Sequence, residues 1–241
     1  AVNIAAYYAA WVRDGKTVWA SRAVVGKPYR QTPVFKARMQ YLVLNPTWTV
    51  PPTILRQDIL PRLRQDPGYL ATRGLQVIDG RGRTIDPGTI DWKTTTARNF
   101  PYLLRQGPGP DNALGRVKFM FPNPHLVYLH DTPARELFAR AERSFSSGCI
   151  RIEKPMELAG LLLAGDQRWT REALDAAIAG GRTQDVRLPQ EITVMLLYLT
   201  AFPGPDGEVQ FREDVYKRDA ALLKALNGPF VFSPPAGYRV E

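Results

Sequence analysis

The sequence predicts an α+β fold, because strand patterns dominate the two ends of the chain and helical patterns occupy its middle. At the start, residues 2–12 and 16–25 flank an Asp14-Gly15 pair, which is the strongest short hairpin signal. From Pro155 onward, apolar residues recur at helical spacing. Near the end, residues 192–200 form an apolar run typical of a buried strand.

The remaining elements follow in order along the chain. Residues 34–44 are rich in β-branched and aromatic side chains and predict a third strand. Thr132-Pro133 supplies an N-cap and a first-turn proline, and Gly180-Gly181 supplies a C-terminal cap. The other expected elements are strands at 115–121 and 125–129, joined by Pro122-Asn123-Pro124, and helices at 133–143, from 155, at 170–179 and at 219–227.

Residues 51–110 have a different character and are expected to be an insertion in one domain that spans residues 1–241. They hold eight of the 21 prolines and one helical pattern, at 53–65, which Pro61 should kink or split. This composition indicates a mobile flap or small cap rather than sheet. The alternative is a set of ordinary proline-rich connecting loops.

Composition excludes several classes of protein. The chain of 241 residues is 44% hydrophobic, and its longest apolar run, residues 192–202, is too short to cross a bilayer, which takes about 20 residues. The net charge of +9 comes from scattered Lys and Arg, with no nucleic-acid-binding motif, so it suits a soluble basic surface or an acidic substrate. The sequence opens at Ala1 without a visible export signal, and this absence is no evidence of a cytosolic location. We expect a monomer.

The chain contains one cysteine, Cys149, which excludes an internal disulfide and a zinc knuckle. Such a thiol is either buried and inert or kept for reaction. Strand alternation separates His125 from His130, and no spacing that includes Asp131 matches a metal motif. We therefore expect neither a metal nor a cofactor, and a structural or exposed role for His125.

The chemistry is expected from Cys149 and His130, which lie nineteen residues apart in the sequence. That interval holds one helix and a return loop, so the histidine at a strand end can meet the thiol. A neighbouring imidazolium lowers a thiol pKa from about 8.5 to roughly 3.5–7.5, which yields the attacking thiolate. Gly148 permits unusual dihedral angles, and backbone amides at Gly148 and Ser147 are candidate donors to an oxyanion.

The segment His130–Arg151, with its Ser-Ser-Gly-Cys-Ile-Arg ending, resembles the signature of the L,D-transpeptidase (YkuD) family. The similarity is greatest to the YcbB-like Gram-negative branch and extends over nearly the whole chain, through the segments 24–33, 45–52, 112–119 and 210–216. One departure is Ser147, which stands where the common signature has histidine. His130 is therefore the only motif histidine near Cys149.

The resemblance implies a β-rich catalytic fold with a helical capping insertion, matching residues 51–110. It implies that Cys149 attacks a carbonyl of a peptidoglycan stem peptide and that the thioester passes to an amine of a second stem, with a role in cell-wall biogenesis and cell shape. It also implies a periplasmic location and acylation of the thiol by carbapenems. The crosslink type, 3-3 or 1-3, stays open.

Four further residues are candidate substrate contacts. Tyr128 shares a strand face with His130, and core packing is the alternative role for its side chain. Arg151 is suited to a substrate carboxylate, and an ion pair with Glu153 is the equal alternative. Trp48 is a candidate wall of the donor site or a core residue, and Ser146 offers a hydroxyl.

Two other functions remain open. Water in place of the amine would make the enzyme an L,D-carboxypeptidase or amidase, and loss of the chemistry would leave a wall-binding module.

Overall fold

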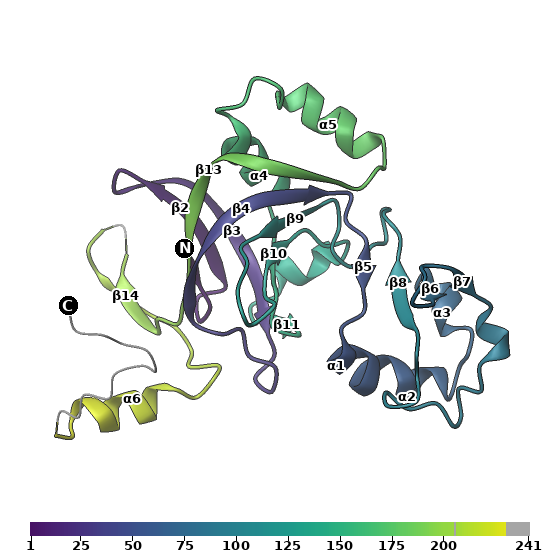
Figure 1. Cartoon of the computed structure of the whole chain (residues 1–241). Coiled ribbons are helices and arrows are strands. Elements are labelled where there is room, and N and C mark those ends of the chain that lie inside the picture. Colours follow the sequence, from purple (N-terminus) through teal and green to yellow (C-terminus); the bar gives the residue numbers. More distant parts are fainter. Residues whose placement is uncertain (205, 230–241) are drawn as a thin grey trace, which may run out of the picture.

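The computed structural model describes residues 1–204 and 206–229 and confirms the α+β class. Its main body is a nine-stranded sheet with the strand order β11-β3-β12-β10-β9-β4-β13-β1-β2. An additional pairing of β2 with β3 closes this sheet on itself (Figure 1). The main core combines side chains of this sheet with those of the helices packed on it, and its large buried side chains include Ile4, Phe119, Phe121 and Ile150.

The N-terminal strands form much as predicted. The hairpin consists of β2 (Tyr8–Arg13) and β3 (Lys16–Gly26), joined at Asp14-Gly15, and β1 (Val2–Asn3) precedes it as a separate short strand. β4 (Phe35–Leu44) pairs along its length with β13 (Gln184–Leu197). β13 begins eight residues before the predicted start at residue 192, and its register shifts between Arg187 and Ile192.

The strands that carry the sequence motifs are short. β9 (Val117–Met120) and β10 (Leu129–His130) are shorter than the strands predicted at 115–121 and 125–129, and β11 (Ser144–Ser146) and β12 (Ile150–Ile152) were not predicted. Residues 125–128 are not strand, because the Asn123 side chain donates to the carbonyls of Phe121 and Val127 and folds this segment into a turn. The exposed ring of His125 lies 4.9 Å from that of Phe35.

The helix predicted at 133–143 is wrong in type and length, since the structure has only a 3₁₀ helix, η3 (Arg135–Ala139). Thr132 caps a turn by accepting from the amide of Ala134. By Arg140 the backbone is extended again, because the chain must reach β11, where the Arg143 carbonyl accepts from Val25.

The later helices agree better with the sequence. α4 (Pro155–Leu163) packs its apolar face against β13 and β9, and α5 (Arg171–Ala179) begins at Thr170, whose hydroxyl accepts from the Ala173 amide. β14 (Ala201–Pro203) and β15 (Val209–Phe211) form a small hairpin before α6 (Asp219–Leu226). No helix in the described residues is long and apolar enough to cross a membrane.

Residues 48–106 form a separate structural unit, here called the inserted lobe, which Figure 1 shows beside the main sheet. The expectation that this region contains no sheet is wrong: β5 (Trp48–Thr49), β8 (Leu103–Gln106), β6 (Leu75–Ile78) and β7 (Thr84–Ile85) form a four-stranded sheet. The lobe has its own core, which includes Leu60, Leu63, Leu75, Trp92 and Leu104.

The helical segment at the start of the lobe is divided, as Pro61 predicts. It consists of α1 (Pro52–Ile54), the π-helical η1 (Leu55–Ile59) and α2 (Leu60–Leu63). A short α3 (Tyr69–Thr72) and a 3₁₀ turn η2 (Pro87–Thr89) complete the lobe. Buried Asn112 ties its two connecting segments together by donating to the carbonyls of Pro46 and Gly107.

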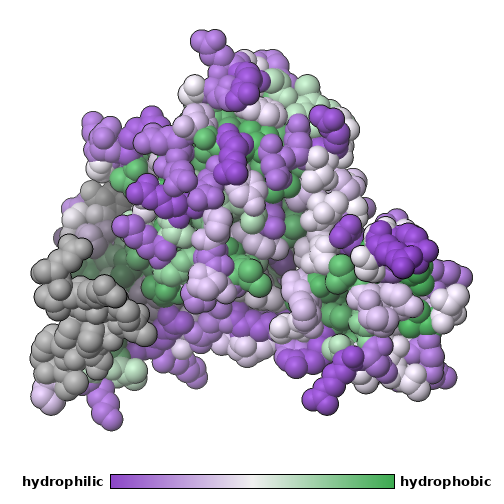
Figure 2. Space-filling model, viewed as in Figure 1, coloured by the Kyte–Doolittle hydropathy of each residue, from purple (hydrophilic) through white to green (hydrophobic). Residues whose placement is uncertain are grey.

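Polar and charged side chains cover most of the face shown in Figure 2, in keeping with the basic composition.

Candidate active site

The register of β10 against β12 places the predicted residues together. These strands are parallel, with Leu129 opposite Ile150 and His130 opposite Arg151, and the Ile150 amide donates to the Tyr128 carbonyl at 3.0 Å. Residues two apart share a sheet face, and paired residues share it too. Tyr128, His130, Cys149 and Arg151 therefore project on one face.

Cys149 follows a tight turn made by Ser146, Ser147 and Gly148. The Ser146 hydroxyl donates to the Cys149 carbonyl at 2.5 Å and accepts from the Gly148 amide at 3.1 Å. Gly148 has φ +115°, a conformation that side chains other than glycine rarely adopt. Thr32 holds the turn from outside, because its buried hydroxyl donates to the Gly148 carbonyl at 2.9 Å.

The thiol of Cys149 lies in a half-buried position beside Tyr128 and two cationic side chains. Burial raises the pKa of this thiol above its ordinary value. Hydrogen bonds from the backbone and the hydroxyl of Tyr128, together with the charges of Lys118 and Arg151, oppose that rise in pKa. Burial and the nearby thiolate raise the pKa of Tyr128, so its hydroxyl stays protonated and able to donate.

His130 is buried, with 4% of its surface exposed. Its Nδ1 lies 2.5 Å from the carbonyl oxygen of Asp131, so Nδ1 carries the proton and donates, and Nε2 is left free to accept one. Burial lowers the pKa of His130 to about 3, and the charges of Arg151 and Lys118 add to this effect. The imidazole is therefore neutral at pH 7.

The two shifts describe a resting site that differs from the expected thiolate and imidazolium. The pKa of the thiol is raised and the pKa of the imidazole is lowered, so both groups are neutral before substrate binds. The sequence pattern could not show this, because burial of the two groups, the largest cause of both shifts, is a property of the folded chain.

Lys118 is a site residue that the sequence analysis did not identify. It pairs with His130 across the antiparallel β9 and β10, and its Nζ lies 3.9 Å from the centroid of the Tyr128 ring. Burial lowers the pKa of Lys118, and the Cys149 thiolate opposes that shift. Only the strand register reveals this residue, since nothing in its local sequence marks it.

Arg151 has a buried Nε that finds no hydrogen-bond acceptor in residues 1–204 and 206–229. Its alternative partner, Glu153, forms an ion pair with Arg22 instead. Burial lowers the pKa of Arg151, and the negative charges of Cys149 and Glu136 oppose that shift. A buried donor without a partner is costly unless a ligand satisfies it.

The other predicted contacts lie in different surroundings. Trp48 is in β5 and packs against the core of the inserted lobe. The Ser147 side chain is exposed and accepts from Arg30 at 2.9 Å. Ser146 is buried, and its hydroxyl is used within the turn.

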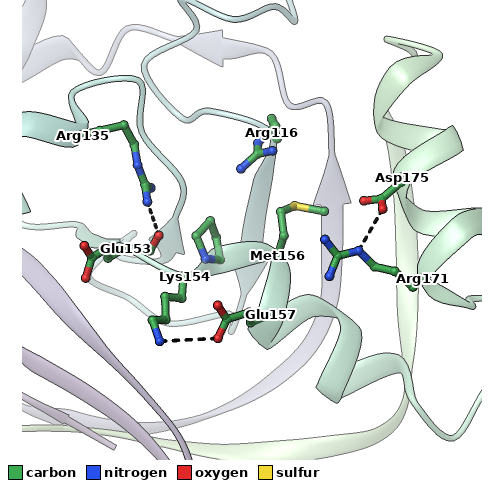
Figure 3. A pocket seen from close by; sticks show the side chains of 9 residues that line it. Arg116, Arg135, Glu153, Lys154, Met156, Glu157, Arg171 and Asp175 are labelled. Atoms are coloured by element: carbon green, nitrogen blue, oxygen red, sulfur yellow. Dashed lines mark hydrogen bonds and ion pairs between the residues drawn. The ribbon is translucent and has the colours of Figure 1, made fainter.

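Asp131 anchors the strand end that carries His130. Its buried carboxylate receives Arg116 at 3.2 Å and Arg135 at 3.4 Å. Both arginines line a hollow of about 360 Å³ on the α4 side, which Figure 3 shows together with Lys154 and Arg171. Neither Cys149 nor His130 lines this hollow, so it is separate from the reacting groups.

Within the described residues, no three His, Cys, Asp or Glu side chains are grouped closely enough to hold a metal ion.

Comparison with known proteins agrees with this geometry. Residues 1–170 match the family model described as YkuD, L,D-transpeptidase catalytic domain. A Haemophilus influenzae protein, provisionally named an L,D-transpeptidase, is 37% identical over 231 residues, which cover 95% of this chain. The chain spans 46% of the length of that relative. The chain belongs to the YkuD family of L,D-transpeptidase catalytic domains.

Proposed function

We propose that this domain forms crosslinks between peptidoglycan stem peptides through a thioester on Cys149. The observation that carries the proposal is the joint placement of the thiol beside Tyr128 and of a neutral, oriented His130 on the same sheet face. Family membership supplies the substrate class. The location that follows from this substrate is the periplasm.

The first half-reaction forms the thioester. His130 Nε2 takes the thiol proton as Cys149 Sγ attacks the carbonyl carbon of the donor stem, and the carbonyl oxygen becomes an oxyanion. The Gly148 amide is engaged by Ser146, whereas the amides of Ser147 and Cys149 have no partner in residues 1–204 and 206–229 and suit the oxyanion. Collapse expels the amine, which receives the proton from His130.

The second half-reaction transfers the acyl group. An amine of a second stem attacks the thioester carbonyl and gives a proton to His130, and the thiolate leaves and is reprotonated. The pKa of His130, about 3, makes its protonated form a strong acid that passes the proton on readily.

Arg151 is the proposed partner of a substrate carboxylate, because its buried Nε lacks an acceptor. A carboxylate there would offset one of the charges that lower the pKa of His130, so binding would make the imidazole a better base. Tyr128 is the proposed contact at the reacting carbonyl. Trp48 remains a proposed wall of the donor site, and the inserted lobe that carries it is proposed to cap that site.

The raised thiol pKa is the observation that favours the inert wall-binding alternative. General-base catalysis is compatible with a raised thiol pKa, because the proton leaves the thiol during the attack and no resting thiolate is needed.

Intact mass spectrometry after incubation with a carbapenem tests the proposal. One covalent adduct is expected on the wild-type protein and none on Cys149→Ala. Absence of an adduct on the folded wild-type protein would contradict the proposal. Purified tetrapeptide muropeptides then separate the outcomes: crosslinked dimers, 3-3 or 1-3, support transfer, and tripeptides alone indicate an L,D-carboxypeptidase.

A further inference from the structure

We infer that Arg30 is a positioning residue that couples the inserted lobe to the turn preceding Cys149. This inference rests on the proposed function, since its consequence is a faster acylation of the thiol. Arg30 lies in the loop between β3 and β4, outside the segment His130–Arg151.

One guanidinium joins the two parts of the molecule. Arg30 Nη1 donates to Ser147 Oγ at 2.9 Å and to Asp58 Oδ2 at 2.5 Å. Nη2 donates to Asp58 Oδ1 at 3.1 Å, and both Nε and Nη2 donate to Gln57 Oε1, at 3.1 and 2.6 Å. The same group therefore holds the nucleophile turn and the lobe at once.

The pair is partly shielded from water. The Arg30 side chain is 9% exposed and that of Asp58 is 41% exposed. Hydrogen bonding to Asp58 raises the pKa of Arg30. A bidentate Arg–carboxylate contact fixes orientation as well as distance, which a single point charge does not.

The backbone of the Arg30 loop also lies against the nucleophile turn. Thr32 donates to the Gly148 carbonyl, and a Cβ on Gly148 would lie 3.7 Å from the Gln31 carbonyl oxygen. The loop folds back tightly, because a Cβ on Gly26 would lie only 2.2 Å from the Arg30 carbonyl oxygen. Tyr216 closes the loop by donating to the Gly26 carbonyl at 2.6 Å. Movement of Arg30 therefore reaches the turn by more than one contact.

On the lobe side, Gln57 and Asp58 belong to the π-helical η1, next to Ile59 and Leu60, which are buried in the lobe core. Short π-helical segments are frequent at functional sites. The acceptors are thus fixed to the lobe as a whole, and a displacement of the lobe would pull on Arg30 and then on Ser147.

The chemical consequence concerns the position of Sγ. A shift of about 1 Å in a reacting group can cost about 100-fold in rate. Loss of the Arg30 contact would let Ser147 and Gly148 move and would misplace the thiol relative to His130. Acyl transfer then depends on a docked lobe.

Single-turnover acylation of Cys149 by a carbapenem, followed by intact mass, tests the inference. Arg30→Ala and Asp58→Ala are each expected to slow acylation about 10- to 100-fold. The double variant should be no slower than the slower single variant, because both remove one coupling. Arg30→Lys should keep part of the rate, since it retains charge without the bidentate geometry.

Arg56→Ala is the matched control, because this exposed residue lies in the same π-helical segment and its side chain makes no hydrogen bond or ion pair within the described residues. Its rate should stay within about twofold of wild type. Equal rates for Arg30→Ala and wild type, or fully multiplicative losses in the double variant, would overturn the inference. Should Arg30→Ala fail to fold, Asp58→Asn carries the same test.

Hydrogen exchange of the peptide containing residues 146–150 separates this inference from the proposed function. Faster exchange in Arg30→Ala and Asp58→Ala, but not in Arg56→Ala, supports the coupling even if the wild-type thiol resists acylation. Unchanged exchange in both variants contradicts the coupling, whatever the thiol does.

Discussion

His130 and Cys149 lie on neighbouring strands, yet the fold holds them in different ways. His130 sits within β10, where the pairings with β9 and β12 and the Asp131 carbonyl fix its position. Cys149 follows a turn that depends on side chains, chiefly Ser146, Thr32 and, through Ser147, Arg30. The position of the base is fixed by strand pairing, and the position of the nucleophile is fixed by side-chain hydrogen bonds to the turn that precedes it. Changes in the side chains that hold the nucleophile turn should therefore slow acylation by misplacing the thiol, and changes at the base should slow proton transfer and alter the pH dependence of folding.

The largest expected effect is on the base itself. His130→Gln should lower the acylation rate about 10²- to 10⁴-fold, the usual contribution of a general base. His125→Gln is the matched control, because His125 is exposed and its ring lies in a tilted contact with Phe35. A His130→Gln protein that is acylated as fast as the control would show that His130 is not the base.

The second expected effect concerns folding in acid. The pKa of His130 is about 3 in the folded chain and about 6.5 unfolded, so its contribution to stability is complete above pH 6.5 and declines toward pH 3. The loss is up to about 1.4 kcal/mol per pH unit. Urea unfolding from pH 7 to 4 should show this slope in wild type and a shallower one in His130→Gln. Identical slopes would show that the histidine titrates normally in the folded state.

The third effect tests the support of the nucleophile turn. Thr32→Val leaves the Gly148 carbonyl and the Gly26 amide without their buried partner. We expect a loss of about 1–3 kcal/mol in the free energy of unfolding, and acylation slowed about 10-fold. Thr32→Ser keeps the hydroxyl and should retain most of both quantities. If Thr32→Val acylates at the wild-type rate while losing stability, the turn does not position the thiol.

The smallest effect concerns Tyr128. Its hydroxyl opposes the rise in the pKa of Cys149, so Tyr128→Phe should raise that pKa further. Iodoacetamide alkylation at a fixed pH below the thiol pKa should slow about 3- to 10-fold, because less of the thiol is ionised. Tyr102→Phe, a change within the lobe core, serves as the control. Faster alkylation of Tyr128→Phe would contradict the assigned hydrogen bond.

Sequence patterns predicted the regular elements best where they are long or capped. The Asp14-Gly15 hairpin, α4 and the Thr170-capped α5 all form. The sheet of the inserted lobe was missed because its strands have two to four residues, too short for alternation to be visible. The 3₁₀ helix η3 replaced a predicted α-helix because β11 must start within five residues of its end.

The site was also predicted only in part from the sequence. The sequence proposed Cys149 and His130, and the strand register places them on one sheet face. Lys118 depends on the antiparallel register of β9, and Arg30 depends on a contact with Asp58 made by folding. The neutral resting state depends on burial. None of these three features has a local sequence signal.

The thiolate absorbance of the protein across pH tests the central claim, that the thiol and imidazole rest in neutral form. Cys149 is the only cysteine, so the difference from Cys149→Ala reports this thiol alone. We predict one transition above the ordinary thiol pKa of about 8.5 and no thiolate at pH 6. A thiolate already present at pH 6 would contradict the account and restore the ion pair of thiolate and imidazolium.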